Sequence, residues 1–248
     1  MTSTLPLRPF FSYYGSKWRI AKRYPIPAHP TIIEPFAGSA GYSLHYPDRQ
    51  VHLYDLSEYV VSVWDYLIHV TPEEIRQLPL DLPPTIDLLT DIPQEARWLL
   101  GFWINKGCDT PRHTPSPWYN HWRLTKPGSI WSGRIRERIA SQIQYIRHWT
   151  VDRIHYAEID PAGYASATWF VDPPYDMQAG THYPHSLSVD YGELATWCRR
   201  LTGQVIVCES SSATWLPFTP IGTSHAGAHA IRAGRISGIT EAVWTRNT

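Results

Sequence analysis

The chain contains 248 residues with a mass of 28.5 kDa, and 43% of the residues are hydrophobic against 18% that are charged. This composition supports one substantial buried core and excludes a largely disordered protein. Lys and Arg together number 22, and so do Asp and Glu, so the net charge by itself indicates no polyanionic partner.

No apolar run approaches the roughly 18 residues of a membrane span, and the N-terminal residues lack the basic start and apolar stretch of a secretory signal. We therefore expect a cytoplasmic protein without membrane contact. The three cysteines are far apart and form no Cys-x-x-Cys pair, so we expect neither a disulfide framework nor a metal site.

Short apolar runs between turn residues predict five buried strands, at residues 31–33, 51–54, 153–157, 167–171 and 204–208. Helix-like stretches alternate with them at residues 16–24, 41–46, 58–69 and 190–201. Strands that alternate with helices predict an α/β fold built on a mostly parallel sheet.

The interval between the second and third expected strands is too long for one crossover connection. It contains a Pro-rich stretch, an expected helix, a turn-rich loop and an amphipathic helix, at residues 71–93, 94–105, 106–132 and 133–149. We expect residues 71–149 to form an inserted subdomain, and residues 1–70 and 150–248 to form one domain around the sheet.

Positive charge is concentrated in the same interval. Residues 97–153 contain ten Lys and Arg residues against three Asp and Glu residues. Such a segment can neutralise phosphates although the whole protein is neutral. We therefore expect the inserted segment to provide a surface for nucleic acid.

The first expected strand runs into a glycine-rich turn, Glu34-Pro35-Phe36-Ala37-Gly38-Ser39-Ala40-Gly41. Ligands bind beyond the carboxyl ends of strands in open α/β sheets, and glycine lets the backbone approach a ligand closely. The turn lacks the complete Gly-x-Gly-x-x-Gly pattern and the Lys-Ser/Thr of a phosphate loop, which disfavours a dinucleotide or a nucleoside triphosphate. From its residues alone, the turn can be either a loop that binds a cofactor or a connection that only packs the strand against the helix.

Asp55 follows the second expected strand. An acid at this position can accept hydrogen bonds from both hydroxyls of a ribose, or it can cap the helix that begins just after Ser57. Because the glycine-rich turn lies just upstream, we favour the ribose interpretation.

The most specific motif is Asp172-Pro173-Pro174-Tyr175, which directly follows the expected strand at residues 167–171. Proline fixes φ and removes a backbone donor, so the turn presents rigid carbonyl groups. An exocyclic amine could donate to Asp172 and to the Pro173 carbonyl while Tyr175 stacks on its ring. These acceptors would orient the nitrogen and stabilise the positive charge that it develops as it attacks a methyl group. The motif indicates methylation of a nucleobase amine; the alternative is a stiff loop whose tyrosine only packs.

Four motifs occur in an order that resembles the Dam-like, alpha-ordered amino-methyltransferases that act on adenine in DNA. They are Phe11-Ser12-Tyr13-Tyr14-Gly15-Ser16-Lys17, the glycine-rich turn at 34–41, Asp55 and Asp172-Pro173-Pro174-Tyr175. The insertion lies where that family has its target-recognition domain. The resemblance implies a Rossmann-like, S-adenosylmethionine-dependent methyltransferase sheet with an inserted, mainly helical target-recognition subdomain. It also implies a bacterial or phage DNA-methylation protein of the restriction-modification kind.

The same resemblance implies S-adenosylmethionine as the methyl donor. Tyr13, Gly15 and Lys17 would lie against its methionine end, Phe36 and Gly38 beneath it, and Asp55 on its ribose. Asp160 stands where the family places an acid on the cofactor's adenine amine, but Pro161 follows it in place of an aromatic residue, and a simple turn acid is the alternative. The implied cofactor-binding residues are Tyr13, Gly15, Lys17, Glu34, Phe36, Gly38, Asp55, Asp160 and Asp172, and the implied catalytic residues are Asp172, Pro173, Pro174 and Tyr175.

A base inside a duplex reaches such a pocket only when it is flipped out of the stack. The loop at residues 106–132 combines cations, aromatic rings and amides, which suit phosphate contacts, stacking and readout of base edges. We expect double-stranded DNA to contact Arg112, Trp118, Asn120, Arg123 and Lys126. The alternative is a loop folded on its own tryptophans.

These patterns together predict a site-specific DNA adenine methyltransferase, a monomer or weak dimer in the cytoplasm of a bacterial host cell. It would transfer a methyl group to the N6 amine of a flipped-out adenine. Methylation of the cytosine N4 amine is the enzymatic alternative, because the same acceptors suit both rings, and a single-stranded or RNA substrate stays open. An alternative of another class is a non-catalytic nucleic-acid-binding module with a methyltransferase shell.

Overall fold

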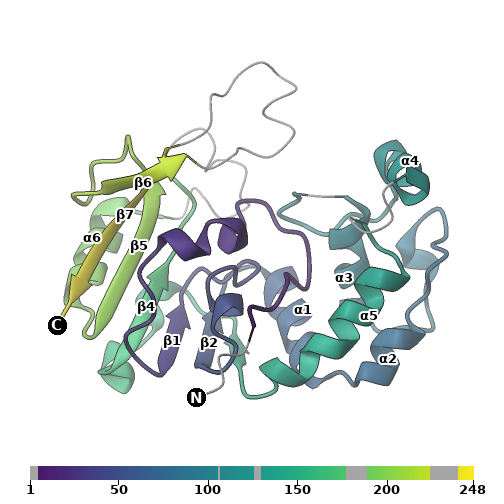
Figure 1. The fold of residues 1–248 in the computed structure, drawn as a ribbon, viewed down its shortest axis with the longest axis horizontal. Coiled ribbons are helices and arrows are strands. Elements are labelled where there is room, and N and C mark those ends of the chain that lie inside the picture. Colours follow the sequence, from purple (N-terminus) through teal and green to yellow (C-terminus); the bar gives the residue numbers. More distant parts are fainter. Residues whose placement is uncertain (1–4, 106, 126–129, 177–188, 224–239) are drawn as a thin grey trace.

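The computed structural model describes residues 5–105, 107–125, 130–176, 189–223 and 240–248, and seven of its strands form one sheet in the order β3-β2-β1-β4-β5-β7-β6 (Figure 1). The strands are β1 Thr31–Glu34, β2 Gln50–Tyr54, β3 Thr150–Asp152, β4 Ala167–Val171, β5 Gln204–Ser210, β6 Thr219–Thr223 and β7 Thr240–Asn247. β1 to β5 are parallel, whereas β7 is antiparallel to both β5 and β6. The predicted α/β class and mostly parallel sheet are therefore confirmed.

The order of the strands reverses between β1 and β4. From β1 the chain proceeds outward to β2 and β3, and from β4 it proceeds outward to β5 on the other side. β1 and β4 are parallel neighbours whose register runs from Thr31 beside Ala167 to Ile33 beside Trp169. Open α/β sheets bind ligands at such a reversal, beyond the carboxyl ends of the two strands.

Six α-helices accompany the sheet within the described residues. They are α1 Glu58–His69, α2 Pro72–Gln77, α3 Gln94–Ile104, α4 Pro117–Thr125, α5 Gly133–Gln142 and α6 Tyr191–Arg200. Short 3₁₀ helices lie at Lys17–Arg19, Ala21–Arg23, Ser43–His45, Ile86–Leu88, Ile143–Ile146, Tyr156–Glu158 and Pro161–Tyr164. Within the described ranges, every helix is too short or too polar to span a bilayer.

The sheet separates two apolar clusters because its side chains alternate between its faces. On β5, Ile206 and Cys208 belong to the larger cluster, which contains α1 and the N-terminal segment, whereas Val205 and Val207 belong to the smaller cluster with α6. Both faces of the central strands β1, β4 and β5 are thus covered, which explains why these strands read as continuous apolar runs in the sequence.

α1 shows how the local sequence sets a helix boundary and a buried face. The Ser57 side chain accepts a hydrogen bond from the Val60 backbone at 3.5 Å and caps the first turn. Val60, Trp64 and Leu67 then recur at helical spacing, and each is fully buried. The helix expected at residues 58–69 is confirmed at both ends.

Several predicted elements are wrong in position or kind. The third strand lies at Thr150–Asp152 instead of residues 153–157, and the loop expected at 106–132 contains the helix α4. The helices expected at 16–24 and 41–46 are short 3₁₀ turns, and β6 and β7 were not predicted. β3 pairs with β2 alone and has an exposed pattern, so it lacks the apolar signal that marks the central strands.

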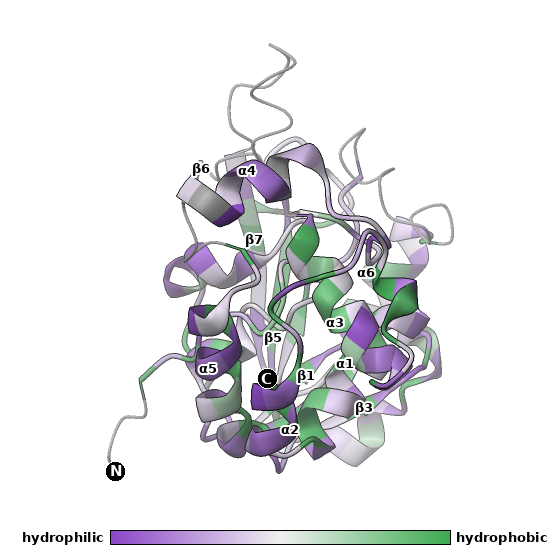
Figure 2. Cartoon of the chain, turned by 90° about the vertical axis from the view of Figure 1, so that its right-hand side faces the viewer, coloured by the Kyte–Doolittle hydropathy of each residue, from purple (hydrophilic) through white to green (hydrophobic). Residues whose placement is uncertain are grey.

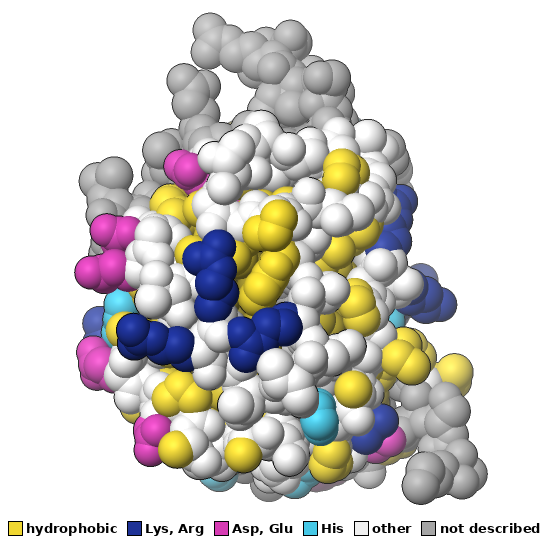
Figure 3. All heavy atoms as spheres, turned by 90° about the vertical axis from the view of Figure 1, so that its left-hand side faces the viewer, with side chains coloured by type: hydrophobic (Ala, Val, Ile, Leu, Met, Phe, Trp, Pro, Cys, Tyr) yellow, Lys and Arg dark blue, Asp and Glu magenta, His cyan; other side chains and the backbone are white. Residues whose placement is uncertain are grey.

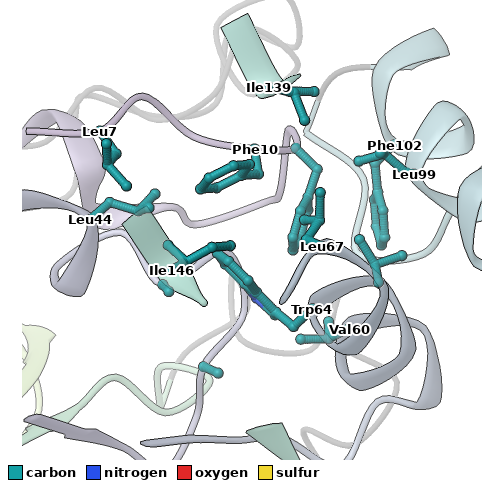
Figure 4. Close-up of a cluster of buried hydrophobic side chains, with 14 of the residues drawn as sticks. Leu7, Phe10, Leu44, Val60, Trp64, Leu67, Leu99, Phe102, Ile139 and Ile146 are labelled. Carbon is teal, nitrogen blue, oxygen red and sulfur yellow. The ribbon is translucent and has the colours of Figure 1, made fainter. Parts of the chain in front are cut away.

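Residues 71–149 carry α2 to α5 and share their apolar core with the rest of the protein. Leu99 and Phe102 of α3 and Ile139 of α5 pack in the same cluster as Phe10 and Trp64 (Figure 4). Figure 2 shows hydrophobic residues on α3, inside the molecule, and hydrophilic ones on α4 and α5 at the surface. Among the described residues, this segment therefore packs on the sheet domain through one continuous apolar cluster.

We predict that Ile139→Ala, which removes a fully buried side chain of α5, lowers the free energy of unfolding of the whole chain by about 2–5 kcal/mol. Because α5 shares a core with the sheet, chemical unfolding should show a single transition that shifts to lower denaturant. Leu88→Ala, at a side chain that is 63% exposed, is the control in the same segment and should change little. Two separate transitions, with only one of them displaced by Ile139→Ala, would contradict a shared core.

Candidate active site

A pocket with about 860 Å³ of space, part of it open to solvent, lies where the carboxyl ends of β1, β2 and β4 meet. This is the point at which the strand order reverses. The pocket is lined by Tyr13, Tyr14, Gly15, Ser16, Lys17, Glu34, Pro35, Phe36, Ala37, Gly38, Ser39, Gly41, Asp55, Leu56, Ser57, Ile154, His155, Tyr156, Phe170, Asp172, Pro174 and Val189.

The glycine-rich turn presents backbone to this pocket. Gly38 has φ of +45°, and a Cβ at this position would lie 3.0 Å from the Tyr13 ring. Its N–H donates to Asp55 Oδ2 at 2.9 Å, and its carbonyl accepts from the Trp64 indole at 2.8 Å. A side chain at residue 38 would therefore be strained and would displace Tyr13, so glycine is required for this close approach.

Asp55 lines the pocket, and its carboxylate is held by two backbone N–H groups. Its Oδ1 accepts from the Ser57 backbone N–H at 2.8 Å, while Oδ2 accepts from Gly38. The two bonds hold the carboxylate at the end of β2, facing the glycine-rich turn. The cap of α1 is Ser57 and not Asp55, so the alternative of Asp55 as a helix cap is wrong, and its carboxylate lines the pocket.

Asp172 follows β4 directly, and its carboxylate forms an ion pair with Lys17, with 2.8 Å between Oδ1 and Nζ. The Lys17 side chain is 9% exposed and that of Asp172 is 20% exposed. Desolvation in the pocket raises the pKa of Asp172 to about 6, although the Lys17 ammonium acts in the opposite direction. Lys17 Nζ also donates to the Gly15 carbonyl at 3.1 Å, so the N-terminal motif and the Asp172 turn are tied together.

The side chain of Tyr175 lies next to this ion pair. Lys17 Nζ is 4.7 Å from the centroid of the Tyr175 ring, which is a cation–π contact. The Tyr175 hydroxyl donates to Glu241 of β7, and the carbonyl of Pro174 accepts from the Tyr191 hydroxyl at 2.6 Å. The turn after β4 is therefore held by side chains of β7 and α6.

Glu34 ends β1 in a buried position, with 2% of its surface exposed. Its Oε1 accepts from the Ser43 backbone at 2.9 Å. Burial raises the pKa of Glu34 to about 8, against the opposing hydrogen bonds from Ser43, and the nearby Asp172 carboxylate adds to the increase. The glutamic acid thus keeps a proton near neutral pH.

The pocket brings together most of the residues predicted to bind the cofactor: Tyr13, Gly15, Lys17, Glu34, Phe36, Gly38, Asp55 and Asp172. Asp160 is not among the lining residues. Its side chain is exposed, and its Oδ1 accepts from the Ala162 backbone at 3.0 Å, so it caps the 3₁₀ helix Pro161–Tyr164. This geometry agrees with the alternative that Asp160 is a simple turn acid.

Three lining residues after β3 were missed, namely Ile154, His155 and Tyr156. The apolar run predicted a strand over these residues, whereas β3 ends at Asp152. Tyr156 lies against Phe36, with 5.4 Å between the ring centroids, and this pair forms an apolar wall of the pocket. If the third strand had been predicted to end at Asp152, Tyr156 would have been placed in the loop that follows the strand. Ligands bind at such loops in open α/β sheets.

As far as they are described, the residues predicted to contact DNA have exposed side chains. Arg112, Asn120 and Arg123 are exposed, the last two on α4, and Arg123 pairs with Asp81 at 3.2 Å. α4 lies on the side toward which β4 and β5 point (Figure 1). Lys126 and the side chain of Trp118 lie outside what the structure describes.

Positive charge is also present on the opposite side of the molecule. Figure 3 shows Lys and Arg side chains beside hydrophobic ones on the face that contains α6 and β7. On β7, the Arg246 guanidinium donates to the carbonyls of Arg199 and Leu201, so this positive charge stabilises the C-terminal end of α6.

No protein-family model matches the chain, and no curated protein matches it. The described residues contain no group of three or more His, Cys, Asp or Glu side chains arranged to hold a metal ion. The pocket combines a carboxylate–ammonium pair, a second carboxylate held by backbone N–H groups, and a glycine in close contact with the Tyr13 ring.

The raised pKa of Glu34 predicts an unusual pH dependence of stability. The folded protein retains a proton that the unfolded chain loses, so this group makes the free energy of unfolding fall as the pH rises from about 4.5 to about 8. The slope from one group is at most about 1.4 kcal/mol per pH unit.

Glu34→Gln keeps the acceptor for the Ser43 backbone and removes the titration. Denaturant unfolding measured from pH 5 to pH 8 should therefore show a flatter decline in the variant than in the wild type. Glu58→Gln, at an exposed residue of α1, is the matched control and should follow the wild-type curve. Parallel curves for Glu34→Gln and the wild type would refute the raised pKa.

Proposed function

We propose that this protein is a DNA methyltransferase that transfers a methyl group from S-adenosylmethionine to the N6 amine of a flipped-out adenine. The observation that carries the proposal is the position of Asp172. Its carboxylate lies in the same pocket as the glycine-rich turn and Asp55, and it already holds a nitrogen cation, Lys17, at 2.8 Å. In this proposal, one cavity would combine the site of the methyl donor with the acceptor of the amine.

The fold supports this proposal. Five parallel strands in the order β3-β2-β1-β4-β5, with a pocket at the reversal between β1 and β4, form the Rossmann-like arrangement that the resemblance implies. In this proposal residues 1–70 and 150–248 are the catalytic domain, and residues 71–149 are the target-recognition part, although its helices pack on the same core.

The residues that line the pocket fit S-adenosylmethionine. Asp55 has a carboxylate fixed by two backbone N–H groups, and it would accept hydrogen bonds from the ribose hydroxyls. Phe36 and Tyr156 form an apolar wall that suits the adenine ring. Gly15 and Lys17 would hold the methionine end, beside the turn after β4. The cofactor would supply an electrophilic methyl group on a sulfonium.

The turn after β4 supplies what the reacting amine needs. Asp172 and the Pro173 carbonyl would accept the two protons of the amine, which directs the nitrogen lone pair toward the methyl group. The Asp172 carboxylate would also offset the positive charge that the nitrogen acquires. Lys17 contacts Oδ1, and a carboxylate has two oxygens, so the ion pair leaves Asp172 a second acceptor for the incoming amine.

Double-stranded DNA would bind on the side of the pocket that carries α4. Arg112, Asn120 and Arg123 are exposed there and suit contacts with phosphates and base edges. Positive charge in residues 97–153 would hold the duplex while one base enters the pocket. In this proposal the protein acts as a monomer or weak dimer in the cytoplasm of a bacterial cell.

The direct test is to incubate the protein with DNA and S-adenosylmethionine and to analyse the nucleosides by mass spectrometry. The proposal requires N6-methyladenine in double-stranded DNA. N4-methylcytosine alone would reject the adenine assignment, and modification of single-stranded nucleic acid alone would reject the duplex. DNA binding without any methylated nucleoside would indicate a binding module.

We predict that Asp172→Asn, which keeps the size of the side chain but removes its charge, lowers the rate of methyl transfer by roughly 10²–10³-fold. Calorimetric titration should still detect binding of S-adenosylmethionine, because Asp55 and the glycine-rich turn are unchanged. The matched control is Asp160→Asn, at an exposed aspartate outside the pocket, which should retain activity within about twofold. Equal activities of the two variants would refute the role of Asp172.

We predict that Arg112→Ala and Arg123→Ala each weaken binding to duplex DNA. If each guanidinium contacts one phosphate, the slope of log affinity against log salt concentration should become shallower by about 0.9 per lost contact. Arg76→Ala is the control, because Arg76 pairs with Glu73 and Glu137 at 2.9 Å on α2 and α5. Fluorescence anisotropy over a salt series measures these slopes, and unchanged slopes for both α4-side variants would place the DNA elsewhere.

A further inference from the structure

Two tyrosine hydroxyls converge on one carboxylate behind the turn that follows β4. Tyr24 donates to Glu241 Oε1 at 2.6 Å, and Tyr175 donates to the same oxygen. Glu241 is 2% exposed and Tyr24 is 3% exposed. A buried carboxylate is stable only when its oxygens have partners, so this arrangement fixes all three side chains relative to one another.

The donor direction in this cluster is well defined. Burial is the main cause that raises the pKa of both Tyr24 and Tyr175 well above the ordinary value, and nearby carboxylates contribute in the same direction. Both phenols therefore stay protonated and donate to Glu241. Hydrogen bonds from neutral donors to a charged acceptor are stronger than those between neutral groups.

The position of Glu241 follows from the antiparallel direction of β7. Because β7 runs against β4 and β5, its first residues lie at the edge where those strands end. Glu241 pairs with Ser210 of β5 and with Gly222 of β6, so hydrogen-bonded strands flank it on both sides. A shift of the register by one residue would move its carboxylate to the other face of the sheet. The sheet thus places this acceptor rigidly.

From these observations we infer that Glu241 is a positioning residue of the active site, which holds the Tyr175 ring in the place where the target base stacks. This inference rests on the proposed function. Glu241 has no contact with the reacting atoms in this scheme and acts through Tyr175.

The contacts of Tyr175 show why its position matters. Its ring centroid is 4.7 Å from Lys17 Nζ, and Lys17 is 2.8 Å from Asp172. The bond to Glu241 fixes the far end of the same ring. Release of the hydroxyl would let the ring tilt toward Lys17 or into the space for the base, and small displacements at a reacting centre reduce the rate strongly.

Other contacts hold the backbone of the turn but not this ring. Glu209 Oε2 accepts from the Asp176 N–H at 3.0 Å, and Tyr191 donates to the Pro174 carbonyl. Removal of the Glu241 contact should therefore leave the turn folded while the aromatic side chain becomes less ordered. This separation makes the inference testable with conservative variants.

The experiment is a double-mutant cycle of Glu241→Gln and Tyr175→Phe, with Tyr24→Phe as the matched control. The rate of methyl transfer is divided by the concentration of protein that binds S-adenosylmethionine. Unfolded molecules are then not counted, and a lower rate reports lost catalysis. Each of the first two variants should lower kcat by about tenfold with little change in the KM for S-adenosylmethionine. The double variant should also lose about tenfold, because both changes remove the same hydrogen bond.

Tyr24→Phe leaves the bond between Tyr175 and Glu241 in place and should keep kcat within about threefold. Additive losses in the double variant, or wild-type kcat in Tyr175→Phe, would overturn the inference. A second measurement is independent of activity, namely the ¹⁹F resonance of 3-fluorotyrosine at position 175, which should shift or broaden in Glu241→Gln and hold its position in Tyr24→Phe.

The two measurements separate this inference from the proposed function. A wild-type protein that methylates no nucleobase would refute the proposed function, and the ¹⁹F resonance would then decide the positioning claim alone. An unchanged resonance in Glu241→Gln would overturn that claim, whether or not the wild type is an active methyltransferase.

Discussion

The ion pair between Lys17 and Asp172 is the interaction on which the rest of the candidate site depends. It joins the N-terminal segment to the turn after β4, two parts of the chain that are more than a hundred residues apart. Both groups are largely withdrawn from solvent, so neither charge would be stable in this place without the other. The pair therefore closes one wall of the pocket and fixes the distance between the N-terminal motif and the turn after β4.

The sheet brings the ends of β1, β2 and β4 to one edge, where Lys17 of the preceding 3₁₀ helix meets Asp172. β1 delivers Glu34 and the glycine-rich turn, β2 delivers Asp55, and β4 delivers Asp172. The antiparallel β7 adds Glu241 to the same edge from the opposite direction. Side chains from four strands thus meet without any long-range loop, and their separations are set by the spacing of neighbouring strands.

The sequence predicted the central strands and most of the pocket because those features are local. Residues 167–171 form an uninterrupted apolar strand, and the motif that follows it contains Asp172 and Tyr175. Features that depend on distant partners were missed. Glu241 becomes recognisable only when β7 pairs beside β5, and Tyr156 only when the end of β3 is known. The positions of Glu241 and Tyr156 follow from how the strands pair, and the periodicity of a single segment does not reveal that pairing.

If the proposed function holds, the charges of the pocket would suit a cationic cofactor. Asp55 and Asp172 line it as carboxylates, Lys17 contributes one positive charge, and Glu34 with a pKa of about 8 is mostly neutral at pH 7. These groups sum to a negative pocket, which attracts a sulfonium and repels the pyrophosphate of a dinucleotide. Loss of the methyl group would convert the sulfonium into a neutral thioether, so the same field that favours binding of the donor would weaken binding of the product. The carboxylates at the strand ends would in this way assist both capture of the donor and release of the product.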